Sequence, residues 1–88
     1  MKNILYILLM LSILAPTYSF ADGCKYSKKA FRSNDIDICK RYAKKAYREF
    51  DWENLDDAAY YARKAYRRSG DNISYCKRYA KKAYREEC

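Results

Sequence analysis

Four cysteines, Cys24, Cys39, Cys76 and Cys88, are the residues of this 88-residue chain with the clearest chemistry. An even number of cysteines in a small exported domain is typical of a disulfide framework, and four cysteines allow three pairings. Structural zinc is the competing use of four thiolates. However, the chain has no histidine and no CxxC pair, and zinc ligands normally stand at short spacings. The sequence therefore predicts two disulfide bonds, with no metal site and no cofactor.

The first 21 residues have the pattern of an export signal. Lys2 precedes an apolar run over 4–14, and Ser19, Phe20 and Ala21 give a small-x-small cleavage pattern. A single membrane anchor is the alternative, although the run is shorter than the roughly 20 apolar residues that a span needs. We expect a signal peptide at 1–21 and a secreted protein, extracellular or, if bacterial, periplasmic. Without Lys2, 18 basic residues oppose 11 acidic ones, a net charge of +7.

The remaining single domain, 22–88, is built by duplication. Residues 39–49, CKRYAKKAYRE, recur unchanged at 76–86, and related kernels stand at 26–32 and 61–67. The leading tyrosines of the four copies are 16, 19 and 18 residues apart, which corresponds to one helix and a short turn per copy. An amphipathic helix cannot bury its apolar face alone, so we expect the copies to pack against one another.

Apolar residues recur at helical spacing within each copy. In the second copy they share one face, as in an amphipathic helix: Ile36, Cys39, Tyr42, Ala43, Ala46, Tyr47 and Phe50. The expected helices lie near 24–32, 36–50, 54–69 and 73–87.

Short polar residues mark the expected helix ends. Asp35, Asn54 and Asn72 precede the first apolar residue of their copies, where such side chains accept hydrogen bonds from free backbone N–H groups. Asn54 with Asp57 resembles a capping box. Gly70 follows the third copy, where the left-handed conformation of a helix C-terminus suits glycine.

The short turns require neighbouring helices to run antiparallel, so the second and fourth helices run parallel and in register. This register places Cys39 level with Cys76 and leaves Cys24 to pair with Cys88. A Cys76–Cys88 bond is disfavoured, because twelve helical steps span about 18 Å, far beyond the reach of a disulfide. The predicted fold is all-α: a small disulfide-stapled antiparallel helical bundle or hairpin array of about four 16–19-residue single-helix repeats.

Tyrosine supplies most of the large side chains. The simplest interpretation places one set in the core with its hydroxyls at the rim: Tyr42, Tyr47, Tyr66, Tyr79 and Tyr84. Tyr60, Tyr61 and Tyr75 lie nearer the helix flanks and are better suited to stacking on nucleobases, sugars or another protein.

Basic residues carry the main functional indication. They repeat on the outer faces of the second and fourth helices and predict a striped positive surface: Lys40, Arg41, Lys44, Lys45, Arg48, Lys77, Arg78, Lys81, Lys82 and Arg85. Such a surface attracts an anionic membrane surface or an acidic glycan in a salt-dependent way. Export disfavours nucleic acid as the partner. A solvated face that only maintains solubility is the simpler alternative.

Three functions are compatible with these features. The first is a secreted cationic effector of the antimicrobial or toxin kind, for which only Trp52, Phe50 or Phe31 remain to insert into a membrane. The second is a helical-repeat module that binds an unidentified protein target. The third is an extracellular adhesive or matrix protein rich in tyrosine and lysine. Catalysis is not expected, because no histidine is present and no serine has a neighbouring base.

The repeat-module hypothesis is linked to a resemblance over about residues 54–76. The segment NLDDAAYYARKA, followed by SGD, resembles the acidic start, Tyr-x-Lys-Ala and Gly-Asp pattern of Sel1-like and tetratricopeptide-type repeats. The resemblance implies packing roles for Ala58, Tyr61 and Ala65, a turn at Gly70, and a cysteine position of secreted members at Cys76. It also implies protein–protein binding. The unit of that family is two helices, whereas this chain repeats every 16 to 19 residues.

Overall fold

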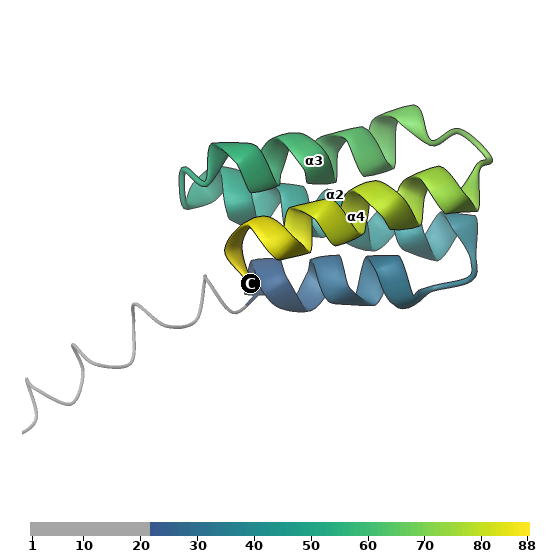
Figure 1. Cartoon of the computed structure of the whole chain (residues 1–88), viewed down its shortest axis with the longest axis horizontal. Coiled ribbons are helices and arrows are strands. Elements are labelled where there is room, and N and C mark those ends of the chain that lie inside the picture. Colours follow the sequence, from purple (N-terminus) through teal and green to yellow (C-terminus); the bar gives the residue numbers. More distant parts are fainter. Residues whose placement is uncertain (1–21) are drawn as a thin grey trace, which may run out of the picture.

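The computed structural model describes residues 22–88, and the predicted signal peptide at 1–21 lies outside the described residues. Four helices make up the described part (Figure 1). The N-terminal helix covers 22–32, and α2 (Ile36–Trp52), α3 (Asp56–Arg68) and α4 (Ile73–Glu87) follow it. The predicted all-α, disulfide-stapled bundle is confirmed.

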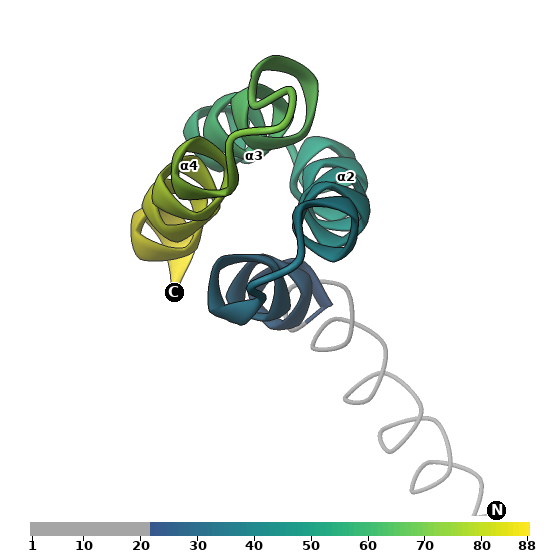
Figure 2. The same ribbon diagram turned by 90° about the vertical axis from the view of Figure 1, so that its right-hand side faces the viewer.

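The four helices form a closed ring around one axis, each antiparallel to the next. Figure 2 shows the N-terminal helix, α2, α3 and α4 in this order around the ring. α3 packs against both α2 and α4, whereas α2 and α4 make far fewer contacts with each other. α2 and α4 are therefore the parallel pair on one diagonal of the bundle.

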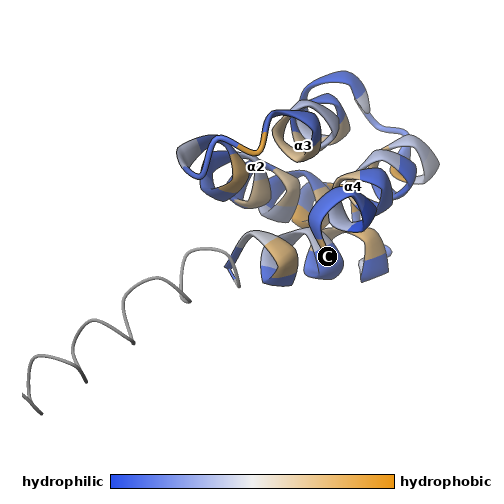
Figure 3. Ribbon diagram, turned by 60° about the vertical axis from the view of Figure 1, so that its left-hand side comes forward, coloured by the Kyte–Doolittle hydropathy of each residue, from blue (hydrophilic) through white to orange (hydrophobic). Residues whose placement is uncertain are grey.

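Alanine fills the centre of the bundle. Nine buried alanines come from all four helices, and only Ala59 of them has measurable exposure: Ala30, Ala43, Ala46, Ala58, Ala59, Ala62, Ala65, Ala80 and Ala83. Phe50, 1 % exposed, is the largest fully buried side chain. Small side chains let the helices approach closely. The apolar faces predicted for α2 and α4 are those that turn inward (Figure 3).

Two disulfide bonds lock this ring, in the same pairs that the register argument predicts. Cys39 and Cys76 are fully buried and join α2 to α4 across the diagonal, with their Cα atoms 6.4 Å apart. Cys24 and Cys88 join the first turn of the N-terminal helix to the end of α4, with a Cα separation of 6.0 Å. The first bond therefore crosses the core and the second closes the ring.

Aromatic pairs, rather than a tyrosine core, close the four seams between neighbouring helices. The tyrosines predicted as core residues are half-buried. Tyr42, Tyr47, Tyr66 and Tyr79 pack against the alanine core, and Tyr84 packs on Phe31, so their rings lie at the edge of the core and not at its centre. The pairs are Tyr26–Tyr42, Tyr47–Tyr66, Tyr61–Tyr79 and Phe31–Tyr84, with ring centroids 6.0, 5.7, 6.2 and 5.4 Å apart.

Two of the three predicted N-caps are confirmed. The Asp35 carboxylate accepts hydrogen bonds from the backbone N–H groups of Asp37 (2.8 Å) and Ile38 (3.2 Å) at the start of α2. The Asn72 side chain accepts one from the N–H of Tyr75 (3.0 Å) at the start of α4. Gly70 has the predicted left-handed conformation, with φ +55°.

The predicted cap and capping box at Asn54 are wrong. Asn54 belongs to the end of α2, where it has a positive φ of 62°. Its N–H bonds to the carbonyl of Asp51 (3.1 Å), and the N–H of Leu55 bonds to the carbonyl of Phe50 (2.9 Å). These two bonds form a Schellman motif with asparagine at the left-handed position. Leu55 consequently occupies the N-cap of α3 without a side-chain hydrogen bond.

Candidate functional site

The basic residues predicted to form a striped surface lie on α2 and α4. These helices lie on opposite corners of the ring (Figure 2), so their outward faces point in opposite directions. The predicted residues therefore form two stripes on opposite sides, because parallel helices in register need not be neighbours. With the basic residues of the other two helices, basic side chains surround the bundle.

Lys40 and Lys77, which are equivalent in the duplicated segment, hold turns in place. Lys40 Nζ donates to the carbonyl of Gly70 (3.2 Å) in the α3–α4 turn. Lys77 Nζ donates to Oδ1 of Asn34 (3.1 Å) in the turn before α2. Both lysines are half-buried. These two lysines of the predicted surface therefore form hydrogen bonds within the protein.

Lys45 and its repeat equivalent Lys82 each lie over a stacked tyrosine pair. Lys45 Nζ is 5.5 Å from the ring centroids of both Tyr26 and Tyr42. Lys82 Nζ is 5.6 Å from the centroid of Tyr61 and 5.1 Å from that of Tyr79. These distances lie within the range of cation–π attraction.

A second lysine completes each group. Lys29 Nζ is 5.4 Å from the Tyr42 ring, and Lys64 Nζ is 4.9 Å from the Tyr79 ring. Two equivalent groups result, on the opposite seams of the bundle. We call them the first Tyr–Lys cluster (Tyr26, Lys29, Tyr42, Lys45) and the second Tyr–Lys cluster (Tyr61, Lys64, Tyr79, Lys82).

The second Tyr–Lys cluster is extended by two more tyrosines. The Tyr60 ring meets Tyr61 edge to face at 5.4 Å, and the Tyr75 ring lies 4.6 Å from Tyr79. The structure thus brings together Tyr60, Tyr61 and Tyr75, which the sequence marked as stacking candidates. Tyr60 is 55 % exposed, whereas the other two are half-buried. Only Tyr60 presents most of its ring to a ligand.

Tyr60, Tyr75 and Tyr79 affect the titration of Lys64. A hydrogen bond with the Tyr60 side chain is the main cause that raises the pKa of Lys64 above its ordinary value of 10.5. Tyr60, Tyr79 and Tyr75 add electrostatic contributions in the same direction, and partial desolvation opposes them. The surrounding phenols therefore favour the charged form of Lys64.

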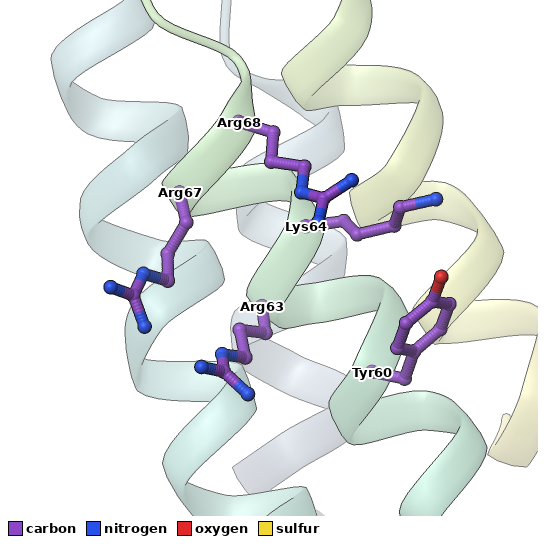
Figure 4. Close-up of a pocket in the computed structure, with 5 residues that line it drawn as sticks. All are labelled: Tyr60, Arg63, Lys64, Arg67 and Arg68. Carbon is purple, nitrogen blue, oxygen red and sulfur yellow. The ribbon is translucent and has the colours of Figure 1, made fainter.

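The outer face of α3 carries a hollow that the sequence-based surface did not include. Tyr60, Arg63, Lys64, Arg67 and Arg68 line it. In Figure 4, Tyr60 and Lys64 lie on the side of α3 toward α4, Arg63 and Arg67 lie on the other side, and Arg68 lies one turn above Lys64. The spacing i, i+3, i+4, i+7, i+8 of these residues was the available signal, because it places all five on one helical face.

A corresponding hollow lies along the N-terminal helix. Its basic lining residues are Lys25, Lys28, Lys29 and Arg32, and α4 contributes Tyr84 and Glu87. This helix was also absent from the predicted surface, since its kernel copy is the most degenerate of the four.

Acidic residues lie near the ends of the helices and in the turns, and not in the central turns of the helices. Of the 11 acidic residues, eight gather at the end of the bundle that holds the α2–α3 turn: Asp22, Glu49, Asp51, Glu53, Asp56, Asp57, Glu86 and Glu87. No acidic residue falls within 23–34, 38–48, 58–70 or 73–85. The side of the bundle is therefore positive around its circumference, and one end is negative.

Large apolar side chains are sparse on the surface. Trp52 is 78 % exposed and Ile38 36 %. Phe50 is buried and Phe31 is half-buried against Tyr84, so the suggestion that these phenylalanines remain free to insert is wrong. Within residues 22–88, no helix is long and apolar enough to cross a membrane. The same residues hold no group of three or more cysteine or carboxylate side chains placed to bind a metal ion.

Comparison with known protein families, with curated proteins and with solved structures found no match for this chain.

Proposed function

We propose that this protein is a secreted, cationic, disulfide-locked helical domain that binds anionic surfaces while it remains folded. The observation that carries this proposal is the acid-free basic body of all four helices, described above. A closely spaced set of cations with no intervening carboxylates produces a positive potential that attracts polyanions and accelerates their association. A surface needed only for solubility would tolerate mixed charges.

The closed core favours adsorption over membrane insertion. The alanine faces are buried inside a ring that the Cys24–Cys88 bond closes. Opening the ring to expose these faces would require breaking contacts that two disulfides constrain. An effector of the antimicrobial or toxin kind would then act on its target by surface contact.

The closed ring gives less support to the helical-repeat module. Repeat proteins that bind partners usually stack into open arrays with an extended concave surface. Here the first and last helices meet, and their termini are bonded through Cys24 and Cys88. Binding would use the outer faces of the helices.

The test is binding of the oxidised protein to three surfaces across a salt series: anionic vesicles, neutral vesicles and a sulfated oligosaccharide. We expect binding to both anionic probes that weakens steeply with salt, and none to neutral vesicles. A variant with Arg63, Arg67 and Arg68 changed to glutamine should bind both anionic probes more weakly.

Two results would count against this function. Absence of binding to every anionic probe at low salt would reduce the positive surface to solvation. Equal binding to neutral and anionic vesicles would assign the interaction to apolar contacts. Release of a trapped dye from anionic vesicles would instead support the membrane-disrupting form of the effector.

A further inference from the structure

The duplication places two comparable hollows on one molecule, and they differ in one informative position. Shifted by 35 residues, Lys28, Lys29 and Arg32 of the N-terminal helix correspond to Arg63, Lys64 and Arg67 of α3. These three positions are therefore basic in both hollows. Lys25, however, corresponds to Tyr60, and Arg68 corresponds to Ser33, which does not line the other hollow. Each hollow thus has four cations, but the one on α3 has an aromatic ring of its own helix where the other has a lysine.

The Tyr60 ring is both exposed and held in position. It is 55 % exposed, yet it contacts Tyr61 edge to face at 5.4 Å, and Lys64 Nζ lies 5.1 Å from its centroid. A ring fixed in this way loses little conformational freedom when a ligand stacks on it. An exposed tyrosine without such contacts would have to be ordered first.

The cations beside Tyr60 suit regularly spaced anionic groups. Arg63 and Arg67 are separated by one helical turn, and the hollow from Tyr60 to Arg68 extends over about 12 Å of helix. Arginine pairs with sulfate-like and carboxylate groups through two parallel N–H donors, which fixes orientation as well as charge. The arrangement therefore fits an extended polymer better than a single small anion.

We propose that the hollow on α3 is a subsite for an acidic glycan, with one sugar ring packed on Tyr60 and its sulfate or carboxylate groups bound by Arg63, Arg67 and Arg68. This proposal rests on the proposed binding of anionic surfaces and specifies its ligand. A sugar ring presents C–H groups that pack on the face of a phenol ring, because the negative face of the ring attracts them. The hollow on the N-terminal helix has no exposed ring at the corresponding position; its aromatic residue is the half-buried Tyr84 of α4, beside the carboxylate of Glu87.

A bare phosphate surface would gain nothing from Tyr60, so charge alone does not explain an anchored ring among arginines. A nucleobase would also stack on tyrosine. The two disulfides, however, are typical of an oxidising compartment outside the cytoplasm, where acidic glycans are the available ring-bearing polyanions.

The test is the variant Tyr60→Lys, which introduces the lysine that the other hollow has at this position and adds a positive charge. Three probes are compared by titration calorimetry at fixed salt: a heparin-derived hexasaccharide, inorganic polyphosphate and a single-stranded thymidine oligonucleotide. We expect the substitution to weaken hexasaccharide binding about five- to tenfold, the scale of one aromatic contact, and to strengthen polyphosphate binding. Tyr60→Phe should retain hexasaccharide binding. Lys28→Gln should modestly weaken the binding of both the hexasaccharide and polyphosphate.

The sign of the affinity change in Tyr60→Lys distinguishes the possible outcomes. Hexasaccharide binding unchanged or strengthened in Tyr60→Lys, with tight binding by the wild type, would overturn the subsite but leave the proposed function standing. A larger loss for the oligonucleotide than for the hexasaccharide would overturn it in favour of a nucleobase. No binding of any probe by the wild type would remove the subsite and the proposed function together. Circular dichroism of each variant verifies that the helices remain intact.

Discussion

Cys39 and Cys76, the same residue of two identical sequence copies, are bonded to each other across the centre of the bundle. A bond between equivalent positions lies on the approximate two-fold axis that relates the two helical hairpins. The seam contacts follow the same symmetry: Tyr26–Tyr42 recurs as Tyr61–Tyr79, with interplanar angles of 21° and 26°. The duplication in the sequence is therefore preserved in the packing.

The two disulfides should contribute unequally to stability. For sequence separations of 64 and 37 residues, restriction of the unfolded chain contributes about 4 kcal/mol for each bond. Cys39 and Cys76 are also buried, so their replacement by alanine leaves a cavity that costs about a further 1–2 kcal/mol. In guanidinium unfolding, Cys39→Ala/Cys76→Ala should lose more stability than Cys24→Ala/Cys88→Ala. A greater loss from the peripheral pair would contradict the central placement.

Gly23 is required by its contact with Phe50. A Cβ atom at position 23 would lie 2.7 Å from Cε1 of Phe50, closer than packed atoms allow. Alanine normally stabilises a helix relative to glycine by about 1 kcal/mol. Here Gly23→Ala should instead lower the free energy of unfolding by about 1–3 kcal/mol, because the buried ring cannot move away freely. Thermal unfolding measures the change.

A double-mutant cycle identifies the cause of that loss. Phe50→Leu removes the ring atoms that meet the added methyl group, at a cost of its own. We expect Gly23→Ala to be much less destabilising in the Phe50→Leu background, which gives a coupling energy of about 1 kcal/mol or more. Additive effects would show that the contact does not determine the choice of glycine.

Asn54 offers a stabilising substitution. Its φ of 62° is easily adopted by glycine, tolerated by asparagine and unfavourable for a β-branched residue. Asn54→Gly should raise the free energy of unfolding by about 0.5 kcal/mol, and Asn54→Val should lower it by about 1–2 kcal/mol. The order Gly, Asn, Val in chemical unfolding tests the Schellman assignment. If Asn54 were the N-cap of α3, glycine would not be the most stable of the three.

Much of the fold could be predicted from three features of the sequence. The helical period gives the buried faces, the short turns require antiparallel neighbours, and the register gives the cysteine pairs. Of the seven residues that the spacing placed on the inner face of α2, four are buried, from Cys39 to Phe50. The other three, Ile36, Tyr42 and Tyr47, are half-buried. Asn54 could not be assigned from its neighbours, since asparagine is favourable both as an N-cap and at a left-handed C-terminal position. The hydrogen bonds of the preceding helix decided between these roles.

The candidate site was less predictable than the fold, because periodicity gives the face of a helix but not its neighbours. Lys45 and Lys82 were recognised as basic, yet their position over tyrosine pairs depends on which helices share a seam. The hollow around Arg63 and Arg67 was missed for a different reason. The identical copies lie in α2 and α4, whereas α3 carries a divergent copy, so sequence identity alone does not point to its basic residues.

The contact between Lys64 and Tyr60 predicts a pH dependence in the alkaline range. The folded-state pKa of Lys64 is raised above its ordinary value of 10.5, so its stabilising effect is complete below that value and is lost as the pH rises through the folded-state pKa. The stability difference between wild type and Lys64→Met should therefore shrink above about pH 10.5. An NMR titration of the Lys64 side chain should show the pKa fall in Tyr60→Phe and remain unchanged in Tyr84→Phe. An unaltered titration in Tyr60→Phe would remove the hydroxyl as the cause.

Trp52, the single tryptophan of the chain, reports on whether the bundle inserts into a membrane. It is 78 % exposed and stands beside Asp51, Glu53 and Asp56, at the acidic end of the bundle. An anionic surface repels this end and attracts the basic sides, so Trp52 should remain in water when the protein binds anionic vesicles. We expect no blue shift of its fluorescence and unchanged quenching by acrylamide, while vesicle sedimentation demonstrates binding. A blue shift accompanied by dye leakage would mean that the acidic end enters the bilayer, and the folded, surface-adsorbed mode would have to be abandoned.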